Sequence, residues 1–418
     1  GAGAGAVTLA SGARAVARAT GPGPRDTLVV VFLRGGLDGL SLVVPSADGD
    51  YYAQRPATAV PQADTIDLDG FFGLNRATAP LHPLFSSGRL AFVHTCGFPH
   101  PTRSHFEAMR RIEEAEASGG PVGSGWLARH LDATSPVGSS GRAIAVDRTL
   151  PTSLQGGPAT LPIPRMDEFR YGGPVATRAA RVARLDAMYR AASEPDRGGG
   201  LTAQALLATF ASIDFAGRVP AGGAVYPPGT FGAGLYEAAT LIKSGVGMEA
   251  IEVDLGGWDD HSHTGPVSGD FAVRSAELAD GLAAFLADLE GDADRTTVLV
   301  HSEFGRRVDE NGSGGSDHGR AGVAMVLGGT HVHGARDAPA RRRRAARAHR
   351  SARRDRRDPR RPSAHARRRV SPARARADAA WPRAVATGRR IPVSGTSRRG
   401  CSGSPERARI RRASPRRV

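Results

Sequence analysis

A continuous apolar run from Leu28 to Leu33 constrains the fold more than any other feature of this 418-residue chain. A strand of a parallel sheet is buried on both faces and shows such a run, whereas a strand with one wet face alternates. Strand-like runs recur at 250–255 and 296–300, and Ala, Leu and Phe at helical spacing fill 271–289 between them. The pattern predicts an α/β domain with a mostly parallel central sheet.

Polar side chains follow both of these later runs. A Gly-Gly turn after the run at 250–255 leads to Trp258, Asp259, His261 and His263, and the run at 296–300 leads to Glu303, Arg306 and, further on, His318. The carboxyl ends of parallel strands share one edge of a sheet, where ligands bind in α/β folds. We therefore expect the active site at this edge, with carboxylates and imidazoles as metal ligands.

Two further segments have a structural and a functional interpretation. Asp38, in the glycine-rich segment after the first run, either ends a strand beside a bound ligand or forms an ordinary Asp-Gly turn. Ser104 begins an expected helix that runs to about Ala117. It either faces a bound anion as an activated hydroxyl or forms a capping box with Glu107.

Charge divides the chain into two parts. From Arg336 onward it holds 29 of its 56 basic residues but five of its 41 acidic residues, a net charge of +24 against −9 for the rest. Arg, Ala, Gly, Pro and Ser dominate 335–418, which we expect to be a disordered tail. The tail is either a basic arm that binds nucleic acid non-specifically or the out-of-frame translation of a G- and C-rich gene.

The first residues resemble part of an export signal. Segment 1–24 is small and apolar before the A-x-A-like sites around Arg14 and Arg18, and it is either the remnant of a secretory signal or a flexible leader. No stretch beyond it reaches the roughly 18 apolar residues of a membrane span. The two cysteines, Cys96 and Cys401, cannot form a disulfide framework or a cysteine metal site.

Between these ends, 25–334 is long enough for one large α/β domain. Its segment at about 151–226 is rich in Pro and Gly, with expected helices at 176–192 and 201–212. We interpret this segment as an insertion or cap over the sheet.

Five motifs give the chain a family resemblance. They are Val30–Leu40, Thr102–Phe106, Gly256–Asp259, Ser302–Arg307 and Asp317–Gly319. Together they resemble the bacterial family called domain of unknown function 1501, which is similar to the alkaline phosphatase and sulfatase superfamily and often carries twin-arginine export signals. The resemblance covers about 26–334. It implies a three-layer α/β sandwich and an exported protein, periplasmic or extracellular.

The same resemblance implies roles for individual residues. Ser104 matches the nucleophile, and Arg306 or Arg103 would bind the non-bridging oxygens of the substrate. Glu303-Phe304 stands where the superfamily has Asp-His, so one imidazole ligand of that pattern is missing. The implied metal ligands are Asp38, Asp259, His261 or His263, Glu303 and His318.

These residues lead to two functional hypotheses. The first is a hydrolase of small phosphate or sulfate esters that uses Zn²⁺, Mn²⁺, Mg²⁺ or Ca²⁺. The second is a non-catalytic extracytoplasmic binding or assembly protein with the same fold, and nucleic-acid binding through the tail is a third, weaker hypothesis.

Overall fold

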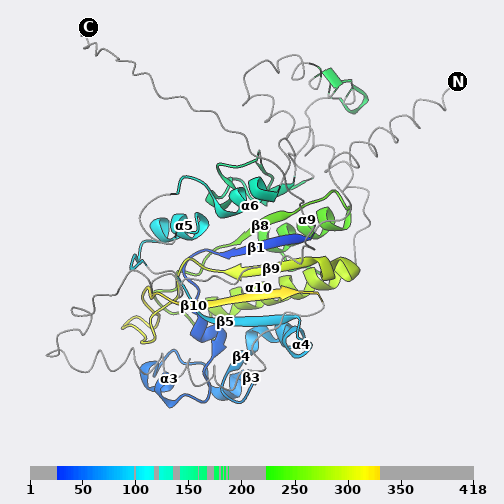
Figure 1. The fold of residues 1–418 in the computed structure, drawn as a ribbon. Coiled ribbons are helices and arrows are strands. Elements are labelled where there is room, and N and C mark those ends of the chain that lie inside the picture. Colours follow the sequence, from blue (N-terminus) through cyan, green and yellow to red (C-terminus); the bar gives the residue numbers. More distant parts are fainter. Residues whose placement is uncertain are drawn as a thin grey trace, which may run out of the picture. The chain divides into compact units, whose positions relative to one another are not determined.

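A seven-stranded, mostly parallel sheet forms the centre of the molecule (Figure 1). The computed structural model describes residues 26–97, 100–116, 122–134, 142–158, 160–166, parts of 174–187, and 223–329. The strand order is β5-β10-β9-β1-β8-β6-β7, and β10 alone runs against the other six. The strands are β1 (Thr27–Leu33), β5 (Leu90–Cys96), β6 (Ala143–Val146), β7 (Leu161–Pro162), β8 (Ala250–Leu255), β9 (Thr296–His301) and β10 (Gly322–Gly328).

The strand β1 lies between β8 and β9 and is paired in parallel with both. Leu33 is the register partner of Leu255, and Phe32 is the partner of His301. The helix-linked pair β8 and β9 is thus parallel, as expected, but β1 separates the two strands. Three carboxyl ends therefore meet at one edge of the sheet.

Helices cover both faces of the sheet, which gives three layers. Val29 and Val31 of β1 pack in one apolar cluster with α9 (Thr230–Lys243) and α10 (Asp270–Leu289). Val30, whose side chain points to the opposite face, packs in a second cluster with Leu127 and Leu131 of α6 (Trp126–Thr134). The predicted three-layer α/β sandwich is confirmed.

Smaller elements complete the described residues. A separate three-stranded sheet has the order β2-β4-β3, and α5 (His105–Glu113) carries residues of the site described below. The other elements are β2 (Val43–Val44), β3 (Thr65–Asp67), β4 (Gly73–Asn75), the helices α2 (Gly39–Leu42), α3 (Gly49–Gln54) and α4 (His82–Ser86), and the 3-10 helices η1 (Gln62–Asp64), η2 (Arg76–Leu81), η3 (Thr152–Leu154), η4 (Val175–Thr177) and η5 (Glu290–Arg295).

The segment expected as an insertion is in part a continuation of the sheet. β7 pairs in parallel with β6 as the edge strand, because Ile144 and Leu161 are register partners. Most of the helix expected at 176–192, all of that at 201–212, the leader at 1–24 and the tail at 335–418 lie outside the described residues. The chain divides into a unit at 1–347, which contains every described residue, and a unit at 348–418. Among the described helices, none is long and apolar enough to cross a membrane.

Candidate metal centre

The loops after β1, β8 and β9 come into direct contact at the carboxyl edge of the sheet. Gly35 has a φ of 124°, and a Cβ atom at this position would lie 2.6 Å from the backbone nitrogen of Asp259. A side chain would therefore separate the two loops. The backbone N–H of Gly35 donates to the buried carboxylate of Glu303 at 2.9 Å, which fixes the third loop against the first.

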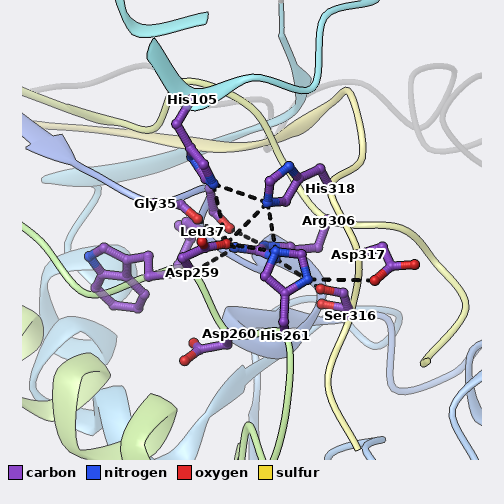
Figure 2. A network of polar contacts seen from close by, with 12 residues as sticks. Gly35, Leu37, His105, Asp259, Asp260, His261, Arg306, Ser316, Asp317 and His318 are labelled. Carbon is purple, nitrogen blue, oxygen red and sulfur yellow. Dashed lines mark hydrogen bonds and ion pairs between the residues drawn. The ribbon is translucent and has the colours of Figure 1, made fainter. Parts of the chain in front are cut away.

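Three imidazoles and one carboxylate converge beside this contact (Figure 2). Oδ1 of Asp259 lies 3.0 to 3.2 Å from Nε2 of each of the three histidines. Nε2 of His318 lies 3.0 Å from that of His105 and 2.8 Å from that of His261. These four residues, His105, Asp259, His261 and His318, are called the histidine–aspartate cluster below.

A hydrogen bond on the far side of the ring orients two of the imidazoles. Nδ1 of His318 lies 2.7 Å from the carbonyl oxygen of Arg103, which only accepts, so this nitrogen carries the proton. Nδ1 of His105 lies 2.7 Å from Oε1 of Glu303, and a carboxylate likewise accepts. Metal-ligating histidines in proteins are oriented by such partners. When either ring is neutral, its Nε2 therefore presents a lone pair to the cluster, and when the ring is protonated, Nε2 can donate to Asp259.

The cluster is a candidate site for a cation. With Nδ1 protonated, the neutral rings of His105 and His318 direct lone pairs at each other and at Oδ1 of Asp259, a repulsive arrangement. A shared proton or a metal ion removes this repulsion. Among the described residues, one group of three titratable side chains has ligand atoms close enough together to hold a metal ion. It consists of His105, Asp259 and His318.

The distances and the donor types fit a divalent transition metal. A tetrahedral site with metal–ligand bonds of about 2.0 Å has ligand–ligand distances of about 3.3 Å, close to the 3.0 to 3.2 Å between the ligand atoms of His105, Asp259 and His318. Imidazole nitrogen with one carboxylate oxygen suits Zn²⁺ better than Mg²⁺ or Ca²⁺, which prefer oxygen. The side chains of Asp259 and His261 are 47% and 45% exposed, so the cluster is open to solvent on that side.

A buried arginine supports the carboxylate of the cluster from the protein side. Nη2 of Arg306 donates to Oδ1 of Asp259 at 2.6 Å, while the rest of the guanidinium donates to backbone carbonyl groups. Burial by itself raises the pKa of Asp259, but hydrogen bonds from Arg306 and His318 outweigh it and lower this pKa to about 2. The side chain of Arg306 is fully buried, so its donors are directed at the protein and not at a substrate.

Asp38 lies outside the cluster, in a buried ion pair. Both of its carboxylate oxygens accept from Arg55, and one also accepts from Ser41. Burial raises the pKa of Asp38, but the charge and hydrogen bonds of Arg55 outweigh it and hold the pKa below its ordinary value. The structure therefore gives this carboxylate an arginine as its partner.

Ser104 precedes α5 but does not form the capping box. Its side chain is exposed and makes no cap hydrogen bond. Glu107 instead accepts a hydrogen bond from Thr102 Oγ1 at 2.7 Å and pairs with Arg111. The structural alternative for Ser104, a side-chain cap, is thus not observed.

The other predicted ligands are divided between the cluster and its surroundings. Asp259, His261 and His318 are in the cluster, whereas Glu303 orients His105 from behind. His263 has a φ of 48°, and its backbone N–H donates to Ser313. Among the described residues its imidazole makes none of the contacts of the cluster, so His261 is the member of this pair that faces the site.

His105 is the cluster residue that sequence reasoning missed. It is the first residue of α5, next to Ser104, and it lies 154 positions before Asp259 in the chain. The motif Thr102–Phe106 contains it, but the predicted role in that motif fell on Ser104 and not on the neighbouring imidazole. A histidine at the start of a helix close to a loop rich in Pro and His was the available signal.

Comparisons with known proteins place the cluster within a sequence family. The family model described as "Protein of unknown function (DUF1501)" matches residues 92–350, which include all four members of the cluster. No curated protein matches the chain. Among solved structures, the C-terminal periplasmic domain of EcEptC from Escherichia coli, in complex with Zn, matches 74% of this chain and 75% of its own at 9% identity and a TM-score of 0.30. A 2-O GAG sulfatase matches 73% of this chain and 64% of its own at 12% identity and a TM-score of 0.25.

Proposed function

This chain belongs to the DUF1501 family of proteins of unknown function, and we propose that it is a metal-dependent hydrolase whose metal ion binds at the histidine–aspartate cluster. The observation that carries the proposal is the convergence of three Nε2 atoms on one carboxylate oxygen, with lone pairs that need a cation between them. When bound, a divalent ion would supply Lewis-acid polarisation of an ester oxygen.

The residues of the chain prepare the site for such chemistry. Glu303 and the carbonyl group of Arg103 hold two imidazoles in the orientation that directs Nε2 inward. Arg306 donates to Asp259 and partly neutralises its charge. A metal ion bound to Asp259 would therefore keep more of its own positive charge. The exposed side chains of Asp259 and His261 leave one side on which a substrate oxygen can approach. A catalytic site needs this access, whereas a structural metal site is closed.

The proposed substrates are small phosphate or sulfate esters. Ser104 is the proposed nucleophile, because its exposed hydroxyl lies at the positive end of α5 and directly before His105. An anion or a developing alkoxide is favoured at that position. Location outside the cytoplasm, through the signal-like leader, is part of the same proposal.

A non-catalytic metal-binding protein is the second candidate. One observation favours it: His261 lies beside the three grouped donors, His105, Asp259 and His318, and with it the donors would reach four, the number found in closed structural zinc sites. The two candidates share the metal and differ in turnover. Metal content alone therefore cannot separate them.

Elemental analysis of the purified full chain, followed by a screen of aryl phosphate and aryl sulfate esters, tests the proposal. We expect about one transition-metal ion for each chain and turnover that Ser104→Ala abolishes without loss of metal. A metal-loaded protein that hydrolyses none of the esters would favour the non-catalytic candidate. Folded protein that takes up no metal would contradict both.

A further inference from the structure

Two buried arginines neutralise carboxylates near the carboxyl edge of the sheet. Arg306 donates to Asp259 within the cluster, and Arg55 forms a two-pronged ion pair with Asp38. Both guanidinium groups are almost fully buried. Arginine is permanently charged in proteins, so these two cations cannot be removed by deprotonation.

Backbone carbonyl groups fix Arg306 in its place. Nε donates to the carbonyl oxygen of Gly36 at 2.7 Å, Nη1 to that of Ser316 at 2.9 Å, and Nη2 to that of Trp258 at 3.0 Å. These acceptors come from three different loops. The guanidinium therefore cannot swing away from Asp259 to admit another cation.

Arg55 is fixed in the same way. It donates to Ser41 at 3.1 Å and to the carbonyl oxygens of Arg307 and Val308 at 2.8 Å. Asp38 has both oxygens occupied by this arginine, and Leu40 and Ser41 donate to them as well. A metal ion at Asp38 would have to displace a buried ion pair, and removing one partner of such a pair is strongly unfavourable.

We infer that the centre holds a single metal ion and that the guanidinium of Arg306 serves as its built-in second cation. In two-metal hydrolases a pair of ions about 3.5 to 4 Å apart shares the charge of the substrate. Here the second positive charge is a buried guanidinium that contacts the ligand oxygen Oδ1 of Asp259 and not the substrate. Among the described residues, no second group of three potential ligands remains for another ion.

The inference rests on the proposed metal site and makes Arg306 a positioning and charge-balancing residue. It also predicts the direction in which the charge of Arg306 changes the affinity for the metal ion. A fixed cation beside a ligand oxygen repels the incoming metal ion. Without that charge, and with the loops still in place, the ion should bind more tightly.

Metal stoichiometry in the full chain is the first test. The metal-stripped protein is mixed with excess Zn²⁺, separated from free ion by gel filtration, and analysed for zinc and protein. One zinc per chain supports the inference, and two per chain overturns it while the proposed function stands. No bound zinc overturns the proposed function and the inference with it.

A pair of variants then isolates the charge. Arg306→Met and Arg306→Lys both lose the guanidinium hydrogen bonds and have similar length, but only the lysine keeps a positive charge. Competition with a chromogenic chelator measures zinc affinity, and circular dichroism checks the fold. We expect the methionine variant to bind zinc at least about tenfold more tightly than the lysine variant. Equal affinities in folded variants would overturn the charge role, and if neither variant folds, the stoichiometry of the unaltered chain decides.

Discussion

Nε2 of His261 lies 2.8 Å from Nε2 of His318, although the two residues are 57 positions apart in the chain. Their loops are joined by backbone hydrogen bonds from Thr264 to Gly314 at 2.9 Å and from Ser316 to Asp260 at 3.2 Å. Asn311 adds a side-chain bond to the carbonyl oxygen of His261 at 2.8 Å. The protein scaffold thus brings the imidazoles together, and the cluster is prepared before any ligand arrives.

Replacement of His105 tests whether its imidazole binds the metal ion directly. We expect His105→Ala to weaken zinc binding by at least about 100-fold, because it removes a direct ligand rather than an orienting group. His263→Ala is the matched control, since its ring takes no part in the cluster contacts described for His261. Competition with a chromogenic chelator measures both affinities. Equal losses in the two variants would contradict the assignment of ligands.

Glu303→Gln tests the orienting role of the buried carboxylate. An amide can turn its N–H₂ group toward Nδ1 of His105 and so favour the tautomer with a proton on Nε2. We expect zinc affinity to fall about 10- to 100-fold, the range for lost orienting partners. Asp317→Asn, whose carboxylate lies 3.5 Å from Nδ1 of His261 at the exposed side, should have a smaller effect. An unchanged affinity in folded Glu303→Gln would show that the contact does not orient the ligand.

The sequence predicted the sheet better than the site. The run that became β1 is continuous in apolar residues because both faces of the strand are buried, and Asp259 and His318 follow from their position after or near β8 and β9. The choice between His261 and His263 was open, because it depends on the backbone of the loop. His105 escaped prediction because it reaches the cluster from a helix on the other side of the site.

Electrostatic partners also escaped prediction. Asp38 follows a buried strand in the pattern of a ligand, yet Arg55, which pairs with it, is 17 positions further on in an unremarkable stretch. Glu107 has the spacing of a capping box with Ser104, but Thr102 and Arg111 compete for its carboxylate. Spacing along the chain identifies possible local bonds, and tertiary contacts decide which of them form.

The ion pair of Asp38 and Arg55 should matter for stability and not for metal binding. We expect Asp38→Asn to lower the free energy of unfolding by about 3 to 5 kcal/mol, because it leaves a buried guanidinium without its counter-charge. Urea unfolding measures the loss. Arg295→Met, which breaks the more exposed pair with Asp292, is the control and should cost less than about 1 kcal/mol. Loss of bound zinc from folded Asp38→Asn would instead identify Asp38 as a ligand.

Glu252 gives the protein a pH-dependent stability that is independent of the metal centre. Its carboxyl group is 2% exposed and accepts a hydrogen bond from Ser153, and its register partner Val30 packs on the face of the sheet covered by α6. Burial, and then the charge of Asp254, raise the pKa of Glu252 from an ordinary value of 4.5 to about 8. Arg34, which pairs with Asp254 and Glu113, offsets this only in part.

The sign of the effect follows from the protons bound in each state. Between pH 4.5 and about 8 the unfolded chain has lost the proton of Glu252 while the folded protein retains it. Folding then takes up a proton, so stability is greatest at the acid end of this window and falls as the pH rises. We expect Glu252→Gln, which imitates the protonated acid, to gain on the unaltered protein by up to a few kcal/mol between pH 5 and 8, since one pKa unit corresponds to about 1.4 kcal/mol. Urea unfolding at pH 5, 6.5 and 8 measures the difference, with Asp280→Asn on the exposed face of α10 as the control. Parallel stability curves for the unaltered protein and Glu252→Gln would show that this carboxyl group is ionised in the folded state throughout the window.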